Sequence, residues 1–423
     1  EFSVLITEFV PVLSLVRDYR KTAERILWPQ NRSRLASLNW GNKRILVYKE
    51  PLGLIGVITP SNYPFSLAIG PIISAILAGN AVILKPAPGT PKTNSLINEI
   101  IRSSLGGSNL CADVFAILSG STEYGKALVT CPLVDKIHFT GSVKAGLAVS
   151  KANAAVRLTP PTLELGGSNA AIILEDADIE EAARVIVFSR FVAMSCNNIK
   201  RVFAVRGAFN KLSWEIERLI PGLEPHETSE KFSERDVERC NDFLSECREH
   251  SGVALQVSVF YGTQFTNVLK PAVVTIRNPE ETGRLKILHE ETFVPILPIV
   301  RCESIEEAVK RANDSEFGLG ASIFTKDKKK FEILAQMLEC GGVYHNDAMT
   351  EFAIPGVPFG GWKNSGSGYT HGPEGLLEFV RLKTVITEAW KPPKFLDKLH
   401  LFPWTETKMK WLKRFLKSII RLS

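Results

Sequence analysis

The sequence lacks the long apolar segment that a membrane-spanning helix needs, because no apolar run approaches ~20 residues. It also lacks a signal-peptide pattern, since the apolar stretch at residues 9–16 is interrupted by Pro11 and follows acidic rather than basic residues. No initiator Met opens the chain, which suggests a trimmed or fragmentary start. We therefore expect a cytoplasmic protein without a membrane span.

The cysteines lack a Cys-x-x-Cys pair and a Cys/His group at the spacing of zinc ligands. There are seven of them, an odd set, at positions 111, 131, 196, 240, 247, 302 and 340. This pattern favours a reducing compartment over a disulfide framework, and we expect no bound metal.

A strong charge bias is absent too, because the net charge is only +6 and Lys and Arg are spread along the chain except at its C-terminus. Nucleic acid is therefore not the expected partner. With 45% hydrophobic and 23% charged residues, the composition is that of a soluble globular protein. A chain of 423 residues exceeds the usual size of one hydrophobic core, so we expect two or three domains.

Short apolar runs alternate with helical segments from Leu54 onward, which predicts an α/β fold. Helical spacing also marks residues 4–27, and residues 45–48 alternate like a strand. Later strands are predicted at 170–174 and 200–205. The alternating segments read LIGVIT, SLAIGPIISAILAG, AVILKPA, CADVFAIL and KIHFTGS. Repeated strand, helix and strand at this pitch indicate βαβ units and a parallel sheet covered on both faces.

A glycine turn joins one of these predicted strands to a helix. The strand ending in His138 and Phe139 runs into Thr140, Gly141 and Ser142, and the following helix contains Gly146. A helix N-terminus after such a turn presents free N–H groups to an anion such as a pyrophosphate. A simple strand-to-helix turn is the alternative that this motif alone leaves open.

Seven segments together resemble the aldehyde dehydrogenase superfamily in their order and approximate spacing. The similarity runs from about Ile45 to about Ile386 and is greatest to the branch with shorter chains that acts on fatty or aromatic aldehydes. The segments are ITPSNYPF (58–65), AGNAVILKPAP (78–88), FTGSVKAG (139–146), TLELGG (162–167), HEETFVPILPI (289–299), NDSEFGLGASIF (313–324) and PFGGWKNSGSGYTHG (358–372).

The resemblance implies NAD(P)-dependent oxidation of an aldehyde to a carboxylic acid through a cysteine thiohemiacetal and thioester. Such chemistry needs a nucleophile, donors for its oxyanion, a hydride acceptor and a base for the hydrolytic water. By position, Cys196 is the predicted nucleophile and Glu164 the general base. Asn62 is predicted to share the oxyanion with a backbone N–H.

The same resemblance implies a cofactor site. Lys85 would bind the adenosine ribose, Glu291 the nicotinamide ribose and Phe293 the ring, while Gly141, Ser142 and Gly146 belong to the glycine turn. Many relatives that prefer NAD have a glutamate at the position of Pro88. Without that carboxylate a 2′-phosphate is tolerable, so the sequence leaves NAD and NADP open.

The segment before Cys196 departs from the family pattern. Relatives usually read Phe-x-Asn-x-Gly-Gln-x-Cys, whereas this chain reads FVAMSC at 191–196 and is two residues shorter between Glu164 and Cys196. A displacement of ~1 Å beside a nucleophile can cost ~100-fold in rate. The alternatives are a catalytically impaired relative that binds nucleotide or acts as a membrane-surface scaffold, and ester hydrolysis or acyl transfer through the same thiol.

The C-terminal segment predicts a basic amphipathic helix at 407–422, after a proline-broken stretch at 391–404. Such a helix can lie on an anionic membrane surface or dock onto a partner subunit. Its apolar face would be formed by Met409, Leu412, Phe415, Leu416 and Ile419.

Three parts are expected along the chain. Residues 1–165 would form a Rossmann-like NAD(P)-binding domain, residues 166–360 a second α/β domain with the catalytic thiol, and residues 361–423 a return segment with the basic tail. A small-molecule aldehyde as substrate and a homodimer as assembly are further implications of the resemblance.

Overall fold

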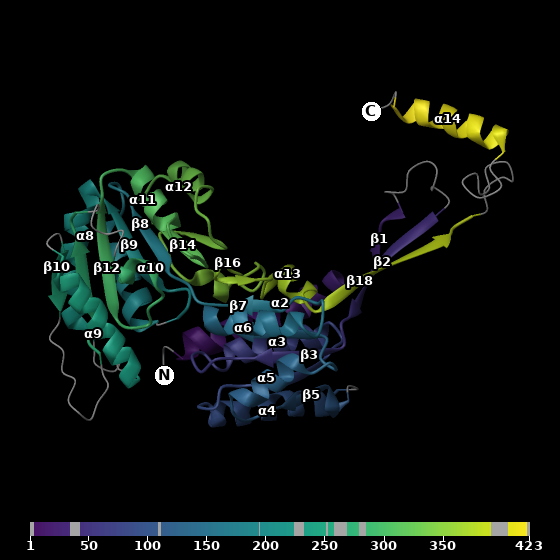
Figure 1. Cartoon of the computed structure of the whole chain (residues 1–423), viewed down its shortest axis with the longest axis horizontal. Coiled ribbons are helices and arrows are strands. Elements are labelled where there is room, and N and C mark those ends of the chain that lie inside the picture. The colour runs from purple at the N-terminus through teal and green to yellow at the C-terminus, as the bar shows by residue number, and fades with distance from the viewer. Residues whose placement is uncertain are drawn as a thin grey trace. The chain divides into compact units, whose positions relative to one another are not determined.

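A computed structural model describes residues 4–33, 43–108, 111–193, 195–223, 232–250, 253–257, 269–278, 285–390 and 405–420. The chain divides into two compact units. The first comprises Glu1–Ile26 and Pro51–Val380, and the second comprises Leu27–Glu50 and Arg381–Ser423. The first unit contains two large sheets, each mostly parallel (Figure 1).

The first large sheet has six strands in the order β17-β7-β6-β3-β4-β5. All neighbours pair in parallel except β17, which is antiparallel to β7. Contacts join α3 to β3 and β4, α4 to β5 and α6 to β6. The elements are β3 (Leu54–Ile58), α3 (Ser66–Leu77), β4 (Ala81–Lys85), α4 (Pro91–Gly106), β5 (Phe115–Ile117), α5 (Thr122–Thr130), β6 (Lys136–Thr140), α6 (Val143–Ala154), β7 (Thr162–Glu164) and β17 (Gly366–Ser367).

The second large sheet has seven strands in the order β10-β11-β12-β9-β8-β14-β15, and only β10 is antiparallel to its neighbour. In Figure 1, α8 and α11 lie close to its strands. The elements are β8 (Asn169–Ile173), α7 (Ile179–Val187), β9 (Ile199–Val205), α8 (Arg206–Leu219), α9 (Glu234–Arg248), β10 (Val253–Val257), β11 (Ala272–Ile276), α10 (Lys286–His289), β12 (Ile296–Cys302), α11 (Ile305–Asn313), β14 (Gly320–Phe324), α12 (Lys328–Ala335) and β15 (Gly342–His345).

The predicted α/β fold with parallel sheets is confirmed. The strands predicted at 170–174 and 200–205 are β8 and β9; β8 begins and ends one residue earlier than predicted, and β9 begins one residue earlier. Every residue of both strands is buried, as expected for strands covered on two faces. The first sheet reaches Glu164 and the second begins at Asn169, so the segment Leu165 to Ser168 passes from one sheet to the other.

The predicted N-terminal helix starts as a π-helix. Residues Leu5–Phe9 form this turn, called η1, and α2 follows at Val10–Leu27. Glu8 in η1 is buried, and its carboxylate accepts the Ser66 N–H at 2.7 Å at the start of α3. Its negative charge lies at the positive end of that helix. This contact fixes the chain start against the loop that carries Asn62.

The second unit contains a three-stranded sheet in the order β1-β2-β18. Its strands are β1 (Gln30–Asn31), β2 (Lys43–Pro51) and β18 (Val380–Glu388). Ion pairs join Lys43 to Glu388 at 2.9 Å and Lys383 to Glu50 at 3.3 Å. The short elements β13 (Phe317–Gly318), β16 (Trp362–Lys363) and α13 (Gly372–Leu377) belong to the first unit.

The predicted C-terminal helix is present as α14 (Glu406–Ile420). The side chains of Phe415 and Ile419, and the proline-broken stretch at 391–404, lie outside the described residues. Among the described residues, no helix has both the length and the apolar character needed to cross a membrane.

Candidate active site

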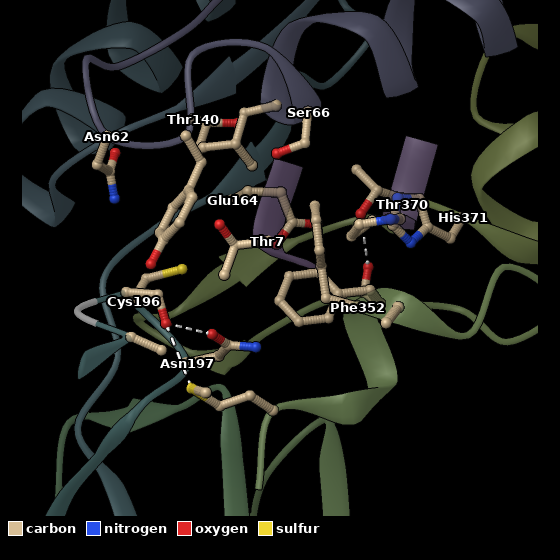
Figure 2. A pocket seen from close by; sticks show the side chains of 18 of the residues that line it. Thr7, Asn62, Ser66, Thr140, Glu164, Cys196, Asn197, Phe352, Thr370 and His371 are labelled. Atoms are coloured by element: carbon tan, nitrogen blue, oxygen red, sulfur yellow. Dashed lines mark hydrogen bonds between the residues drawn. The ribbon is translucent and has the colours of Figure 1, made fainter. Parts of the chain in front are cut away.

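A cavity of about 200 Å³ in the first unit gathers residues from widely separated parts of the chain (Figure 2). It is lined by Asn62 from the loop before α3, Glu164 from the end of β7 and Cys196 from the loop before β9. Figure 2 shows Asn62 and Cys196 on one side of this space, and Thr370 and His371 on the other. The three residues predicted to carry the chemistry therefore line one cavity.

Most of the remaining lining is apolar. Side chains from the N-terminal turn, from α3 and from the segment that follows β15 surround the space. The apolar or aromatic lining residues include Ile6, Pro11, Leu67, Pro71, Phe188, Ala348, Met349, Phe352, Ala353 and Phe359. Apolar walls of this kind suit a hydrophobic ligand body, with a few polar groups that orient its reactive end.

Cys196 lies three residues before β9, in a loop that follows a short π-helix, η5 (Phe188–Val192). Its residue is partly buried and its carbonyl oxygen accepts a hydrogen bond from Lys200 Nζ at 2.8 Å. Burial raises the pKa of the Cys196 thiol to about 12, against the opposing effect of the Lys200 ammonium. A neutral thiol is therefore the resting form, and a nearby cation or base is needed to generate the thiolate.

Glu164 ends β7 and is buried, with only 5% of its surface exposed. Neither carboxyl oxygen has a hydrogen-bond partner among the described residues. Burial raises the pKa of Glu164 well above its ordinary value, and the carboxylates of Glu351 and Glu378 add to the effect. In this conformation burial favours the protonated form of Glu164, so its use as a base requires a more polar position.

Asn62 lies in the loop between β3 and α3, next to Tyr63, whose φ is 47°. Met349 and His371 also line the cavity and have φ values of 66° and 61°. A non-glycine residue in this left-handed region costs of order 1–3 kcal/mol and is typical of functional sites. Three such residues around one cavity support its assignment as the functional site.

Two buried histidines also line the cavity and were missed by the sequence reasoning. Burial lowers the pKa of His138 to about 3 and that of His371 to about 4, so both rings are neutral near pH 7. Nδ1 of each ring has no partner among the described residues. Both stand in segments that the sequence analysis quoted, but neither was singled out there as a site residue.

Lys85 lies at the carboxyl end of β4, where its ammonium donates a hydrogen bond to the carbonyl of Pro86 at 3.0 Å. Burial lowers the pKa of Lys85. A hollow of about 520 Å³ adjoins this strand end and is lined by Pro86, Ala87, Pro88, Asn94, Arg102, Ser119 and Gly120, among others. Its described lining includes no acidic side chain.

The glycine turn lies at the carboxyl end of β6. Ser142 caps α6 by accepting the Ala145 N–H at 3.3 Å. A Cβ on Gly146 would lie 2.5 Å from the Leu165 side chain, and one on Gly141 would lie 2.6 Å from the Phe139 ring. The two glycines therefore allow close packing of the turn and helix against the sheet, at the same sheet edge as Lys85.

Glu291 and Phe293 lie in the loop between α10 and β12 and meet the side chain of Lys200. Glu291 Oε1 accepts the Gly167 N–H at 3.0 Å and lies 3.5 Å from Lys200 Nζ. The Lys200 ammonium lies 4.9 Å from the centroid of the Phe293 ring. The carboxylate expected at a ribose thus forms an ion pair in this structure.

Two buried cations support these loops. Lys200 is described above, and Arg190 in η5 has no exposed surface. Arg190 donates hydrogen bonds to the carbonyls of Ile296, Thr292 and Val294, which hold the loop of Glu291 and Phe293. Burial lowers the pKa of Arg190 to about 9. The sequence did contain a signal for both residues, because each is a basic residue inside an apolar run. Arg190 stands in VIVFSRFV and Lys200 in IKRVFAV.

The family model for the Aldehyde dehydrogenase family matches residues 6–385. The chain belongs to the aldehyde dehydrogenase family. The resemblance drawn from the seven segments is thereby confirmed. As a family member the chain is an NAD(P)-dependent oxidoreductase of the aldehyde dehydrogenase type.

Named relatives and solved structures agree with this assignment. The chain is 32% identical to the 4,4'-diapolycopene aldehyde oxidase of Methylomonas sp, over 98% of this chain and 76% of the relative. It is 31% identical to the geranial dehydrogenase of Castellaniella defragrans, over 88% and 76% of the two chains. A Mycobacterium tuberculosis aldehyde dehydrogenase complexed with NAD+ matches with a TM-score of 0.80 and 30% identity, over 91% and 78% of the two chains.

Proposed function

We propose that Cys196, Glu164 and Asn62 carry out the oxidation of an apolar aldehyde to its carboxylic acid. The observation that carries this proposal is that the three residues line one cavity, although 134 positions of sequence separate the first from the last. Cys196 does so even though the segment before it is short. The geometry thus favours a working nucleophile over the impaired alternative.

In the proposed reaction the Cys196 thiolate attacks the aldehyde carbon, and the carbonyl oxygen becomes an oxyanion. The Asn62 amide and a backbone N–H of the nucleophile loop donate hydrogen bonds to this oxyanion. The thiohemiacetal on Cys196 then loses a hydride and becomes a thioester. NAD or NADP, when bound, would supply the hydride acceptor. Glu164 then takes a proton from water, the water attacks the thioester, and the acid leaves as the Cys196 thiolate is restored.

Glu164 must change its environment to serve as that base, because its burial in this structure disfavours the ionised carboxylate. Gly166 and Gly167 follow closely in the chain and leave the backbone free of side chains there. We propose that Glu164 turns toward the cavity when water attacks the thioester. The base would then ionise in the more polar position.

For the cofactor, we propose that Lys85 and the turn of Gly141, Ser142 and Gly146 hold the nucleotide at the edge of the first sheet. Glu291 and Phe293 would contact the nicotinamide end, close to Lys200 and Cys196. The hollow beside Pro88 has room for an adenosine ribose and contains no described acidic residue that would reject a 2′-phosphate. Both NAD and NADP therefore fit the residues present.

The substrate class follows from the apolar lining of the cavity. The named relatives act, by their names, on diapolycopene aldehyde and geranial, which have apolar bodies. We propose a medium or long apolar aldehyde for this chain.

A trapped intermediate tests these assignments. In Glu164→Gln the thioester should form but hydrolyse slowly, so intact-mass measurement after mixing with aldehyde and NAD or NADP should show an acyl adduct. The adduct should be absent in Cys196→Ala, whereas Cys131→Ala, made in the Glu164→Gln background, should keep it. An adduct that persists in Cys196→Ala would show that another residue is the nucleophile.

We also propose a homodimer, on the family resemblance, and a peripheral position on an anionic membrane through α14. Met409, Trp411, Leu412 and Leu416 of α14 are each more than 40% exposed, and lysines stand among them. The parent should float with phosphatidylserine vesicles, whereas the double variant Leu412→Glu/Leu416→Glu should not. Light scattering, which measures the mass in solution, should give that of a dimer. Unchanged flotation would exclude the helix as the membrane contact and favour docking on a partner subunit.

A further inference from the structure

Lys200 connects several segments of the chain beside the nucleophile. It lies in β9, and only 1% of its surface is exposed. Its ammonium donates hydrogen bonds to the carbonyls of Gly167 at 2.7 Å, Cys196 at 2.8 Å and Ser195 at 3.2 Å. Glu291 Oε1 lies 3.5 Å away as its ionic partner. The three N–H donors of the ammonium are therefore fully used.

The partners of this side chain differ from those of its neighbour Arg201. Lys200 lies at an irregularity in the pairing of β9 with β8, where Asn169 pairs with Ile199 and Ala170 pairs with Arg201. Arg201 donates to the carbonyls of Ser168 and Ala312, whereas Lys200 turns back over the loop that precedes its own strand. One ammonium thus joins the nucleophile loop, the segment after β7 and the loop of Glu291.

This arrangement bears on the nucleophile because the sequence FVAMSC before Cys196 departs from the expected pattern, and the interval from Glu164 to Cys196 is two residues shorter than expected. Two of the carbonyls that Lys200 holds belong to that loop, one of them Cys196 itself. Loss of these bonds would leave the two carbonyls without these partners in a buried position, which is unfavourable. It would also free the backbone that sets the direction of the thiol.

We propose that Lys200 is a positioning residue that fixes the Cys196 loop and places a positive charge beside the thiol. The proposal rests on the proposed function, in which Cys196 is the nucleophile. It adds a residue that acts through Cys196 and does not itself touch the substrate.

The charges around the pair decide the expected pH behaviour. Burial raises the pKa of the Cys196 thiol most, and the Lys200 ammonium lowers it. The Glu291 carboxylate and, when ionised, Glu164 raise it, and the N–H of Asn197 lowers it. Burial lowers the pKa of Lys200 to about 8; Glu291 and Cys196 oppose this change, and Arg190 adds to it. Below pH 8 the ammonium is charged, and its charge makes the pKa of the Cys196 thiol lower than it would be without Lys200.

The experiment is the pH dependence of Cys196 alkylation by iodoacetamide, followed by mass spectrometry of the peptide that contains it. It needs neither aldehyde nor cofactor. The background carries Cys111→Ser and Cys131→Ser, because these thiols are the exposed and half-exposed ones among the other six. Well below its pKa, the alkylation rate of a thiol is proportional to its thiolate fraction, and one pKa unit is tenfold.

Lys200→Met should lower the alkylation rate at pH 7 about tenfold, whereas Lys200→Arg, which keeps the charge, should recover most of the rate. Arg201→Met removes a neighbouring buried cation whose carbonyl partners lie outside the Cys196 loop, and it should leave the rate of Cys196 within about twofold of the parent. Equal rates in Lys200→Met and its parent, with circular dichroism and melting curves that show a folded protein, would overturn the proposal.

A second variant keeps the test decisive if Lys200→Met does not fold. Lys200→Gln keeps N–H donors for the buried carbonyls but removes the positive charge, so it should also lower the alkylation rate at pH 7. A parent-like rate in folded Lys200→Gln would contradict the proposal. Failure of the proposed function would appear elsewhere, as aldehyde turnover that survives in Cys196→Ala.

Discussion

Gly167 lies in the segment after β7 and packs against the nucleophile loop. Because it has no side chain, the two segments can approach each other closely. A Cβ at this position would lie 2.7 Å from the carbonyl oxygen of Cys196 and 2.9 Å from Leu319 Cβ. Ordinary contacts begin at about 3.4 Å, so Gly167→Ala requires a displacement of about 0.7 Å.

The displacement should reach Cys196, because its carbonyl oxygen is the atom nearest to the added Cβ and Gly167 is itself hydrogen-bonded on both sides. Its N–H donates to Glu291 Oε1 at 3.0 Å and its carbonyl accepts from Lys200 Nζ at 2.7 Å. A misplacement of ~1 Å at a reacting group can cost ~100-fold in rate. We therefore expect kcat to fall about 10- to 100-fold in Gly167→Ala, with a stability loss of about 1–3 kcal/mol from overpacking.

The assay is steady-state formation of NADH or NADPH, with melting temperature as the measure of folding. Gly89→Ala is the matched control, since a Cβ there meets no atom within 4 Å, and its kcat should stay within twofold of the parent. A folded Gly167→Ala protein with the parent's kcat would refute the reasoning that this glycine positions the nucleophile.

Two further predictions concern buried titratable side chains, Glu164 and Arg190. Burial raises the pKa of Glu164 in the folded state. Below about pH 4.5 its carboxyl is protonated in the folded and in the unfolded protein. As pH rises from there toward the folded-state pKa, only the unfolded protein ionises, so the parent loses stability. Glu164→Gln does not titrate, and its melting temperature should rise relative to that of the parent between pH 4 and pH 8; a constant difference would contradict the assigned burial of a protonated carboxyl. Arg190→Lys keeps the buried charge but cannot reach all three carbonyls of Thr292, Val294 and Ile296, so we expect a loss of at least about 2 kcal/mol and weaker cofactor binding by calorimetry. Arg184→Lys, at an exposed position on α7, should change neither, and a parent-like Arg190→Lys would argue against the support of that loop by Arg190.

Much of the fold could be predicted because its signals are local. Apolar runs such as 81–85 and 136–140 are strands β4 and β6, and the glycine turn after β6 begins α6 with Ser142 as its cap. The π-helical start of the chain was not predicted, because its cause is tertiary: Glu8 is drawn to the N-terminus of α3.

The site was predicted only where the family motifs name residues. Asn62, Glu164 and Cys196 line one cavity, but nothing in their spacing shows that Ile6, Phe352 or His371 would join them. Those residues come from both ends of the first unit and meet only through tertiary packing. Lys200 was overlooked because a lysine in a strand usually marks an exposed position, whereas here it turns back to buried carbonyls.

The most direct test of the account is cofactor reduction by the purified chain across short, aromatic and long apolar aldehydes, with NAD and with NADP, beside Cys196→Ala and the control Cys131→Ala. The account predicts turnover that favours apolar aldehydes, survives in Cys131→Ala and is lost in Cys196→Ala. Turnover that persists in Cys196→Ala, or a folded chain that binds the cofactor and turns over none of the aldehydes, would contradict it.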